Sequence, residues 1–101
     1  MTARSFLIAD DHWAVRKGVR EIILNLYDNA DIYEAKSHQE VLDLLLVKDR
    51  FDLILLDLAM PGMSPHKGFA KIRARVPTIP LVILSGTDDP STVRDMMKAG
   101  A

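Results

Sequence analysis

The chain has 101 residues, of which 49% are hydrophobic and 27% are charged, and its formal net charge is -1. This length allows one domain at most, residues 1–101, and the near-neutral charge argues against a dedicated nucleic-acid surface. The absence of cysteine excludes disulfides and thiolate metal sites, and no apolar run suits a signal peptide or a membrane span. A cytoplasmic protein is therefore expected.

The first half of the chain alternates between strand and helix patterns. Ser5–Ala9 is an apolar run typical of a strand. Trp13–Leu26 has apolar residues at helical spacing, which predicts an amphipathic helix with an inward face of Val15, Val19, Ile22, Ile23 and Leu26. Ile32–Ala35 contains Glu34 and suits an edge strand. Ser37 can cap a second helix, whose inward residues are expected to be Val41, Leu44, Leu45 and Val47.

The middle of the chain contains its most apolar segment, FDLILLDLAMPG at residues 51–62. Leu53–Leu56 is an unbroken apolar run, as expected for a central strand covered on both faces. The run ends at Asp57, and a turn signal with Pro61 and Gly62 follows. After a loop at residues 59–65, a short helix is predicted from about His66 to Arg75, with Phe69, Ile72 and Val76 as its apolar residues.

The last part of the chain repeats the pattern of a strand followed by a helix. Leu81–Leu84 is wholly apolar and ends at Ser85. Asp89 and Pro90 are typical of a helix start, and Gly100 is typical of a helix end. Strand and helix therefore alternate four times along the chain. This order predicts an α/β fold with a doubly wound parallel sheet and helices on both faces, which makes three layers.

Three carboxylates follow two of the predicted strands. Asp10 and Asp11 come after the first strand, and Asp57 ends the central one. The carboxyl ends of parallel strands meet at one edge of the sheet, where like charges repel unless a cation lies between them. Mg2+ could bind there, with Asp11 and Asp57 as direct ligands, Asp10 holding a water, and a backbone carbonyl after Asp57 adding an oxygen. The ion would let the Asp57 carboxylate attack an electrophilic phosphorus, and Ser85 could bond a phosphoryl oxygen.

At these residues the chain resembles the receiver domain of a two-component response regulator. The matching elements are Asp10-Asp11 after the first strand, Asp57 in LILLDLAMPG, and Ser85-Gly86 after LVIL. DDHWAVRKGV at residues 10–19 resembles the NarL/FixJ subfamily, and the resemblance covers essentially the whole chain. It implies a flavodoxin-like sheet of strand order 2-1-3-4-5, in which the fifth strand, a lysine and a last helix would follow Ala101.

The resemblance also assigns roles to single residues. It makes Asp57 the phosphoacceptor and Ser85 the residue with the switch hydroxyl, and it places Mg2+ on Asp10, Asp11, Asp57 and the Ala59 carbonyl. A sensor histidine kinase would be the phosphoryl donor in a phosphorelay. DNA would be contacted only by an output domain outside this chain, which regulates transcription. The chain is then a phosphoacceptor and not an enzyme, with at most self-catalysed phosphorylation and dephosphorylation.

Two departures from the family pattern affect these expectations. Receivers usually have Gly where Pro65 stands, so the loop before the third helix is expected to differ. Without the family's lysine, which neutralises a phosphoryl oxygen, residues 1–101 are expected to bind metal but to phosphorylate poorly. Without the fifth strand, the apolar strand Leu81–Leu84 becomes a sheet edge. Self-association is therefore expected, as a dimer through the fourth strand and fourth helix or by exchange of an element.

The isolated histidines and methionines have less specific interpretations. His12 is interpreted as a partly exposed polar residue without a direct chemical role, and His38 and His66 as surface residues. Met60 is interpreted as loop packing. The third helix carries basic residues that are expected to form a solvated face: Lys67, Lys71, Arg73 and Arg75.

Three other functions remain open from the residues alone. An aspartyl-nucleophile phosphohydrolase usually has a second Asp two residues after the nucleophile, where this chain has Ala59. A dinucleotide-binding domain needs a glycine-rich loop after its first strand, where this chain has acids that repel a pyrophosphate. A receiver-like adaptor that acts only through protein contact is disfavoured by the three acids.

Overall fold

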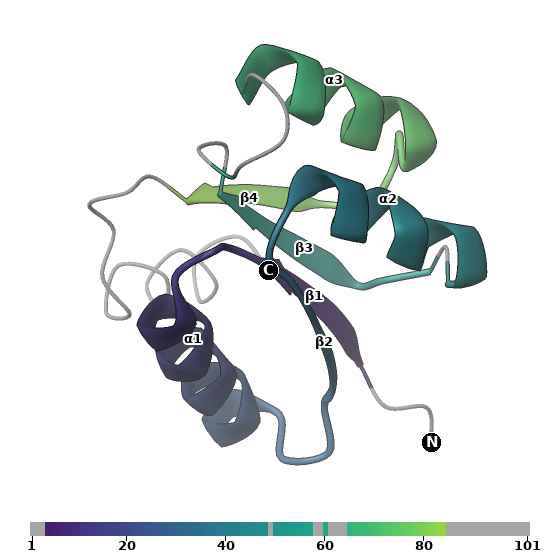
Figure 1. The fold of residues 1–101 in the computed structure, drawn as a ribbon. Helices are drawn as coiled ribbons and strands as arrows, with labels where there is room; N and C mark the ends of the chain where they lie inside the picture. Colours follow the sequence, from purple (N-terminus) through teal and green to yellow (C-terminus); the bar gives the residue numbers. More distant parts are fainter. Residues whose placement is uncertain (1–3, 49, 58–59, 61–64, 85–101) are drawn as a thin grey trace.

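Four parallel strands form a single sheet in the computed structural model of the chain, which describes residues 4–48, 50–57, 60 and 65–84 (Figure 1). The sheet has the order β2-β1-β3-β4, with β1 at Ser5–Ala9, β2 at Asp31–Ala35, β3 at Leu53–Asp57 and β4 at Leu81–Leu84. The helices are α1 at Trp13–Leu26, α2 at His38–Val47 and α3 at Pro65–Arg75. The predicted α/β class and the order 2-1-3-4 are confirmed. The helix predicted from Asp89 lies outside the described residues.

The side chains of β1 and β3 alternate between two hydrophobic cores, one on each face of the sheet. Phe6, Ile8, Leu53 and Leu55 pack with α1, whereas Leu7, Ala9, Ile54 and Leu56 pack with α2 and α3. Figure 1 shows α1 on one face of the sheet and the other two helices on the opposite face. Every residue of β3 is buried, because this strand lies inside the sheet and is covered on both faces. The prediction of a central strand with helices on both faces is confirmed.

The predicted cap of α2 is present at Ser37. Its hydroxyl accepts a hydrogen bond from the Glu40 backbone N–H at 3.1 Å, and the Glu40 carboxylate accepts one from the Lys36 N–H at 3.1 Å. These contacts satisfy backbone donors that the first helical turn leaves without an intrahelical partner. The β2–α2 connection is therefore well defined at the edge of the sheet.

Three predictions of burial were wrong. Leu26 is 39% exposed and Val47 is 84% exposed, although helical spacing places both on inward faces. Periodicity gives the side of a helix on which a residue lies, and it does not say how far the covering sheet extends. His38, expected at the surface, is fully buried. The other predicted inward residues of α1 and α2 are buried or half-buried, and Met60 is buried in the core as expected.

His38 lies where α2 meets α3, directly against Gly68. A Cβ atom at position 68 would collide with the His38 ring. The absence of a side chain on Gly68 therefore makes the space that the buried imidazole occupies. We call this pair the α2–α3 contact.

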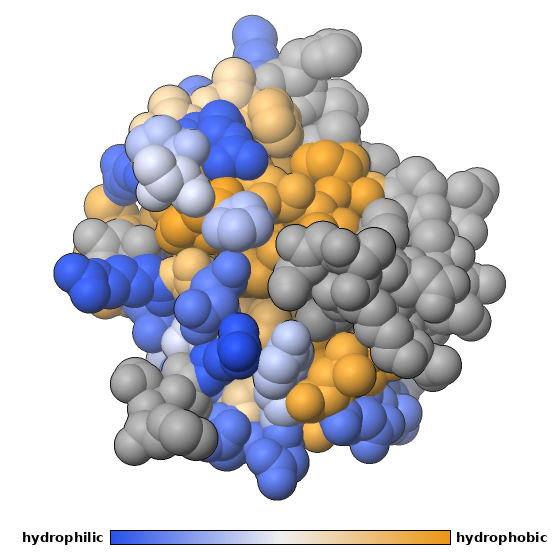
Figure 2. Space-filling view, turned by 180° about the vertical axis from the view of Figure 1, so that it is seen from behind, coloured by the Kyte–Doolittle hydropathy of each residue, from blue (hydrophilic) through white to orange (hydrophobic). Residues whose placement is uncertain are grey.

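The surface of the molecule combines apolar and charged regions. On the face seen in Figure 2, hydrophobic residues gather near the middle and hydrophilic residues lie along much of the rim. Within the described residues β4 is an edge of the sheet, and its Ile83 is 38% exposed. None of the described helices has the length and apolar content needed to cross a membrane.

Candidate functional site

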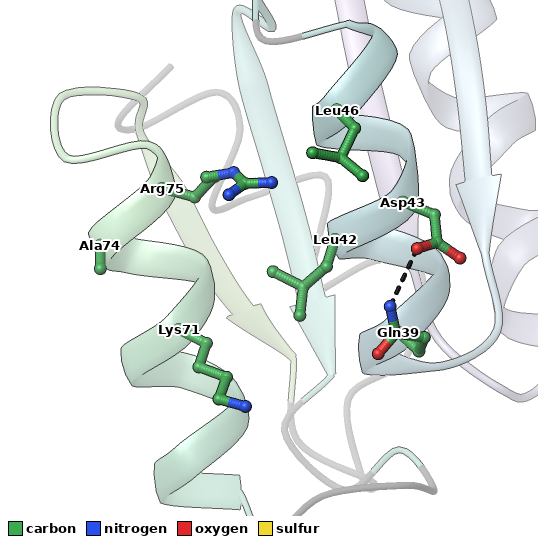
Figure 3. Close-up of a pocket in the computed structure, with 7 residues that line it drawn as sticks. All are labelled: Gln39, Leu42, Asp43, Leu46, Lys71, Ala74 and Arg75. Atoms are coloured by element: carbon green, nitrogen blue, oxygen red, sulfur yellow. Dashed lines mark hydrogen bonds between the residues drawn. The ribbon is translucent and has the colours of Figure 1, made fainter.

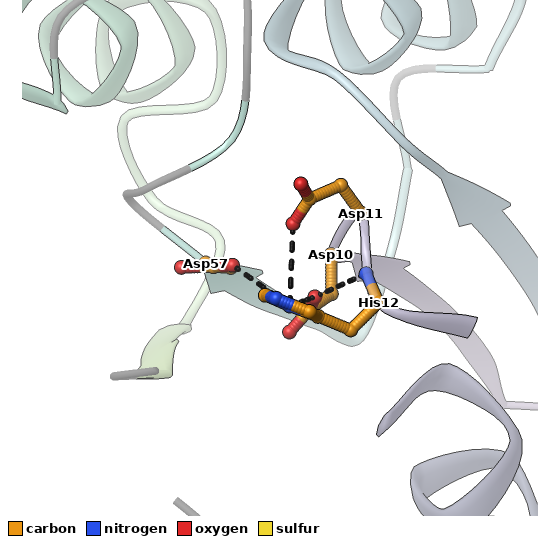
Figure 4. Close-up of side chains that lie close together, drawn as sticks. All are labelled: Asp10, Asp11, His12 and Asp57. Carbon is orange, nitrogen blue, oxygen red and sulfur yellow. Dashed lines mark hydrogen bonds and ion pairs between the residues drawn. The ribbon is translucent and has the colours of Figure 1, made fainter. Parts of the chain in front are cut away.

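The carboxyl ends of β1 and β3 bring three acids and a histidine together (Figure 4). Asp57 is 1% exposed and Asp10 is 3% exposed, whereas Asp11 and His12 face solvent. One ligand atom from each of these four residues lies within 4.8 Å of the others. We call this group the acid cluster. Sequence analysis predicted that Asp10, Asp11 and Asp57 converge, and the parallel pairing of β1 with β3 accounts for it.

Asp10 is held in place through its main chain. Its N–H donates a hydrogen bond to the Ala35 carbonyl at 3.0 Å, which continues the β1–β2 ladder by one residue. Its carbonyl accepts a hydrogen bond from the Arg16 guanidinium at 2.7 Å, and Arg16 also pairs with Glu34 at 2.9 Å. Through these contacts Arg16, which belongs to the start of α1, links the end of β1 to the edge strand β2.

The role of Arg16 was missed in the sequence, although a signal for it exists. Arg16 precedes Val19 and Ile23 by three and seven residues, so it belongs to the inward face of α1. It is buried at 5% exposure, and a buried guanidinium requires partners with negative charge or carbonyl dipoles. The sequence does not show that Glu34 would supply that charge from another element.

His12 is partly exposed, as predicted, but its ring lies inside the acid cluster, which sequence analysis did not predict. Its backbone N–H donates to Asp10 Oδ1 at 2.7 Å, and its ring Nδ1 is also 2.7 Å from that oxygen. The same Nδ1 lies 3.2 Å from Asp11 Oδ1 and 3.9 Å from Asp57 Oδ2. The side chain remains 58% exposed, so the ring lies over the cluster at its border with solvent.

The carboxylates raise the pKa of His12 above its ordinary value of 6.5. The largest cause is the hydrogen bond with Asp10, followed by the negative charges of Asp10 and Asp11, with a smaller contribution from Asp57. Each of these interactions favours the imidazolium over the neutral ring. The protonation of His12 therefore depends on the charge of the acid cluster.

The donor set of the acid cluster fits a hard divalent cation such as Mg2+. Carboxylate oxygens are the protein ligands that Mg2+ prefers, and two of the three acids are nearly inaccessible to bulk water. Closely spaced buried carboxylates favour a cation, because each ionised group raises the cost of ionising the next. The predicted roles of Ala59 and Ser85 fall outside the described residues and stay predictions.

A groove between α2 and α3 is the next concave region that we considered (Figure 3). On the α2 side of this groove, the Gln39 side chain donates a hydrogen bond to the Asp43 carboxylate at 2.9 Å. The residues that line it are Gln39, Leu42, Asp43, Leu46, Lys71, Ala74 and Arg75. This lining contains no histidine or hydroxyl side chain that could act as a base or nucleophile. The acid cluster is therefore the stronger candidate for chemistry.

Comparison with known proteins places the chain in one family. The model of the response regulator receiver domain matches residues 6–101. The chain is 38% identical over 95 residues to the glycerol metabolism activator of Pseudomonas putida, covering 94% of this chain and 43% of the relative. It is 33% identical over 97 residues to the nitrate/nitrite response regulator protein NarL of Escherichia coli (strain K12), covering 96% and 44%. The chain thus spans less than half the length of these relatives.

Solved structures show the same fold at lower sequence identity. The chain is similar to the chemotaxis response regulator CheY4 of Vibrio cholerae, with a TM-score of 0.78 and 19% identity over 97% of this chain and 98% of that one. It is also similar to the phosphorylated cyanobacterial phytochrome response regulator RcpA, with a TM-score of 0.75 and 20% identity over 99% and 77%. These structures support the flavodoxin-like arrangement of strands and helices.

Proposed function

Because the chain belongs to the response regulator receiver family, we propose that Asp57 accepts a phosphoryl group from a sensor histidine kinase in a two-component phosphorelay. The observation that carries this proposal is the acid cluster. Asp57 is buried at the carboxyl end of the central strand, and one ligand atom each from Asp10, Asp11, His12 and Asp57 lies within 4.8 Å of the others. A single acid at a strand end could serve as a cap, whereas three converging acids are costly to keep without a cation.

The chain's own residues position the nucleophile. Asp57 is the last residue of β3 and is paired in register with Leu84 of β4, so its backbone is fixed before the donor arrives. Its oxygen would form a bond to phosphorus while the bond from phosphorus to the kinase histidine breaks, and the electron pair stays on the imidazole nitrogen. Mg2+ held by Asp10, Asp11, Asp57 and the Ala59 carbonyl would supply positive charge beside the phosphoryl oxygens.

The proposed role is that of a phosphoacceptor that switches an output, and not that of an enzyme that turns over a separate substrate. Phosphorylation and dephosphorylation would at most be self-catalysed, with Ser85 contacting the phosphoryl group. By analogy with the relatives, which are named as activators and response regulators, phosphorylation would control transcription through a DNA-binding output domain. Response regulators are generally cytoplasmic, and we propose the same location here.

Phosphorylation of Asp57 is tested with a small phosphodonor. Acetyl phosphate and Mg2+ should add one phosphoryl group to a chain extended beyond Ala101, as measured by intact mass, and Asp57→Asn should abolish the addition. Asp43→Asn is the matched control, since Asp43 makes only an exposed helix contact with Gln39 in the described structure. An unmodified wild-type chain, or an Asp57→Asn chain modified as fast as wild type, would contradict the proposal.

The same variants distinguish the adaptor alternative. A receiver-like adaptor would bind its partner equally well as the wild-type chain and as the Asp57→Asn variant, with or without acetyl phosphate. A phosphorylation switch would change that affinity on addition of acetyl phosphate only in the wild-type chain. Titration of a purified cognate kinase or output domain therefore separates the two functions.

Self-association stays a prediction. Its support is that β4 is an edge of the sheet within the described residues and exposes part of Ile83, and an unpaired apolar edge is a template for another strand. A dimer through the fourth strand and the predicted fourth helix should appear in sedimentation equilibrium at micromolar concentration. A single species of 11.3 kDa would contradict it.

A further inference from the structure

The acid cluster contains a nitrogen donor besides its carboxylates. His12 Nδ1 lies 2.7 Å from Asp10 Oδ1, 3.2 Å from Asp11 Oδ1 and 3.9 Å from Asp57 Oδ2. Among the described residues, it is the only histidine that belongs to a group of possible metal ligands. Figure 4 shows the ring among the three carboxylates, with Asp57 to one side of it and Asp11 above it.

The spacing of these atoms suits a single coordination shell. Ligand atoms that lie about 2.0 to 2.3 Å from one ion are separated by about 3 Å when adjacent and by up to about 4.6 Å when opposite. The four donor atoms of the cluster lie within 4.8 Å of one another. These separations are therefore close to the range that a single coordination shell allows.

The position of the ring is built into the β1–α1 turn. His12 is the N-cap residue of α1, and its backbone N–H donates to the same Asp10 oxygen that its ring contacts. Asp10 is itself fixed by the Ala35 carbonyl and by Arg16. The imidazole is thus held beside the carboxylates from its own backbone, while its 58% exposure leaves the ring free to adjust without disturbing the core.

On the premise of the proposed function, we propose that His12 is a nitrogen ligand of the bound ion and that the site prefers a first-row transition dication to Mg2+. Mg2+ demands oxygen ligands and keeps several of its waters. Imidazole nitrogen adds affinity for transition ions, which increases from Mn2+ to Ni2+ and Cu2+, whereas carboxylates accept both classes of ion. A mixed set of three carboxylates and one imidazole therefore selects for the transition ion.

The alternative is that His12 only stabilises the turn through Asp10. Both interpretations account for the contacts described above, but they predict different neighbours for an ion bound at the acid cluster. If His12 is a ligand, its ring contacts the ion directly. If His12 only stabilises the turn, the carboxylates alone bind the ion. The magnetic coupling between a bound paramagnetic ion and the histidine nitrogen reports this difference.

The test is pulsed electron paramagnetic resonance of Mn2+ bound to the protein, prepared with unlabelled or with 15N-labelled histidine. We expect a nitrogen coupling that changes with the label and disappears in His12→Asn. We also expect the dissociation constant of Ni2+, an ion that imidazole favours, to rise about tenfold or more in His12→Asn, with that of Mg2+ changing less than about threefold. Trp13, next to the site and 66% exposed, reports both titrations through its fluorescence.

Each result decides one question. Bound Mn2+ without a histidine nitrogen coupling in the wild-type chain would overturn the proposal and leave the acidic metal site intact. A higher Mg2+ affinity in His12→Asn, with unchanged Ni2+ affinity, would show that the ring only competes with the ion, and would also overturn it. No binding of either ion would contradict the metal site of the proposed function itself. The wild-type spectrum answers the question even if the variant is unstable.

Discussion

The acid cluster and the α2–α3 contact each contain a histidine, and the two regions use it in opposite ways. His12 lies at the surface with its ring nitrogen against three carboxylates. His38 is fully buried where α2 meets α3, and its ring fills space left by Gly68. The first histidine contacts charged carboxylates, whereas the second is enclosed in space that Gly68 leaves open. The comparison teaches that residue type alone does not predict the role of a histidine, because His38 meets Gly68 of another helix, whereas His12 contacts mainly its sequence neighbours Asp10 and Asp11.

The largest expected effect comes from filling the space at Gly68. Gly68→Leu should lower the free energy of unfolding by about 2–3 kcal/mol, because the added side chain collides with the buried His38 ring. This loss should appear although leucine is the better helix former by about 1 kcal/mol. Urea denaturation measures it. In a chain that also carries His38→Ala, the cost of Gly68→Leu should fall by at least about 1 kcal/mol.

Ala70→Leu is the matched control for this prediction. Position 70 is on the same helix but exposed, so the same side chain should change stability by less than about 0.5 kcal/mol. Equal effects at positions 68 and 70 would show that the packing of His38 against Gly68 is unimportant. The contrast between His12 in the acid cluster and His38 in the α2–α3 contact would then lose its basis in the packing of His38.

A second expected effect concerns the support of the acid cluster. Arg16→Gln should cost about 2 kcal/mol of stability, since the Asp10 carbonyl and Glu34 lose a buried cationic partner. Arg20→Gln removes a guanidinium from the same Glu34 but at 44% side-chain exposure, and it should cost less than about 1 kcal/mol. Similar losses from both substitutions would mean that burial does not strengthen the Arg16 contacts.

The smallest expected effect is the pH dependence contributed by His12. Its pKa should lie above 6.5 in NMR titrations of the metal-free chain, because of the hydrogen bond with Asp10 and the nearby carboxylates. The imidazolium therefore contributes stability that is fully present below pH 6.5 and is lost as the pH rises through the raised pKa. Asp10→Asn should lower the pKa of His12, whereas Asp43→Asn should leave it unchanged. A His12 pKa at or below 6.5 would show that the carboxylates of the acid cluster do not favour the imidazolium.

Much of the architecture could be predicted from local patterns. The apolar runs at Ser5–Ala9, Leu53–Leu56 and Leu81–Leu84 correspond to β1, β3 and β4, because short apolar runs bounded by acids or turn residues suit buried parallel strands. The alternation of these runs with helical periodicity determined the fold class. It also determined that Asp10, Asp11 and Asp57 converge, since parallel strands carry their ends to one edge.

What the sequence by itself determined is thus the order of elements, the class of sheet and the edge at which the acids meet. Only the tertiary structure decided how single polar residues are used. Arg16 is buried because Glu34 approaches it from β2, and His38 is buried because Gly68 of α3 has no side chain. His12 contacts Asp10 and Asp11 within its own turn, and only its approach to Asp57 depends on the pairing of β3 with β1. Burial of a polar group depends on partners brought by other elements, and no local pattern encodes those partners.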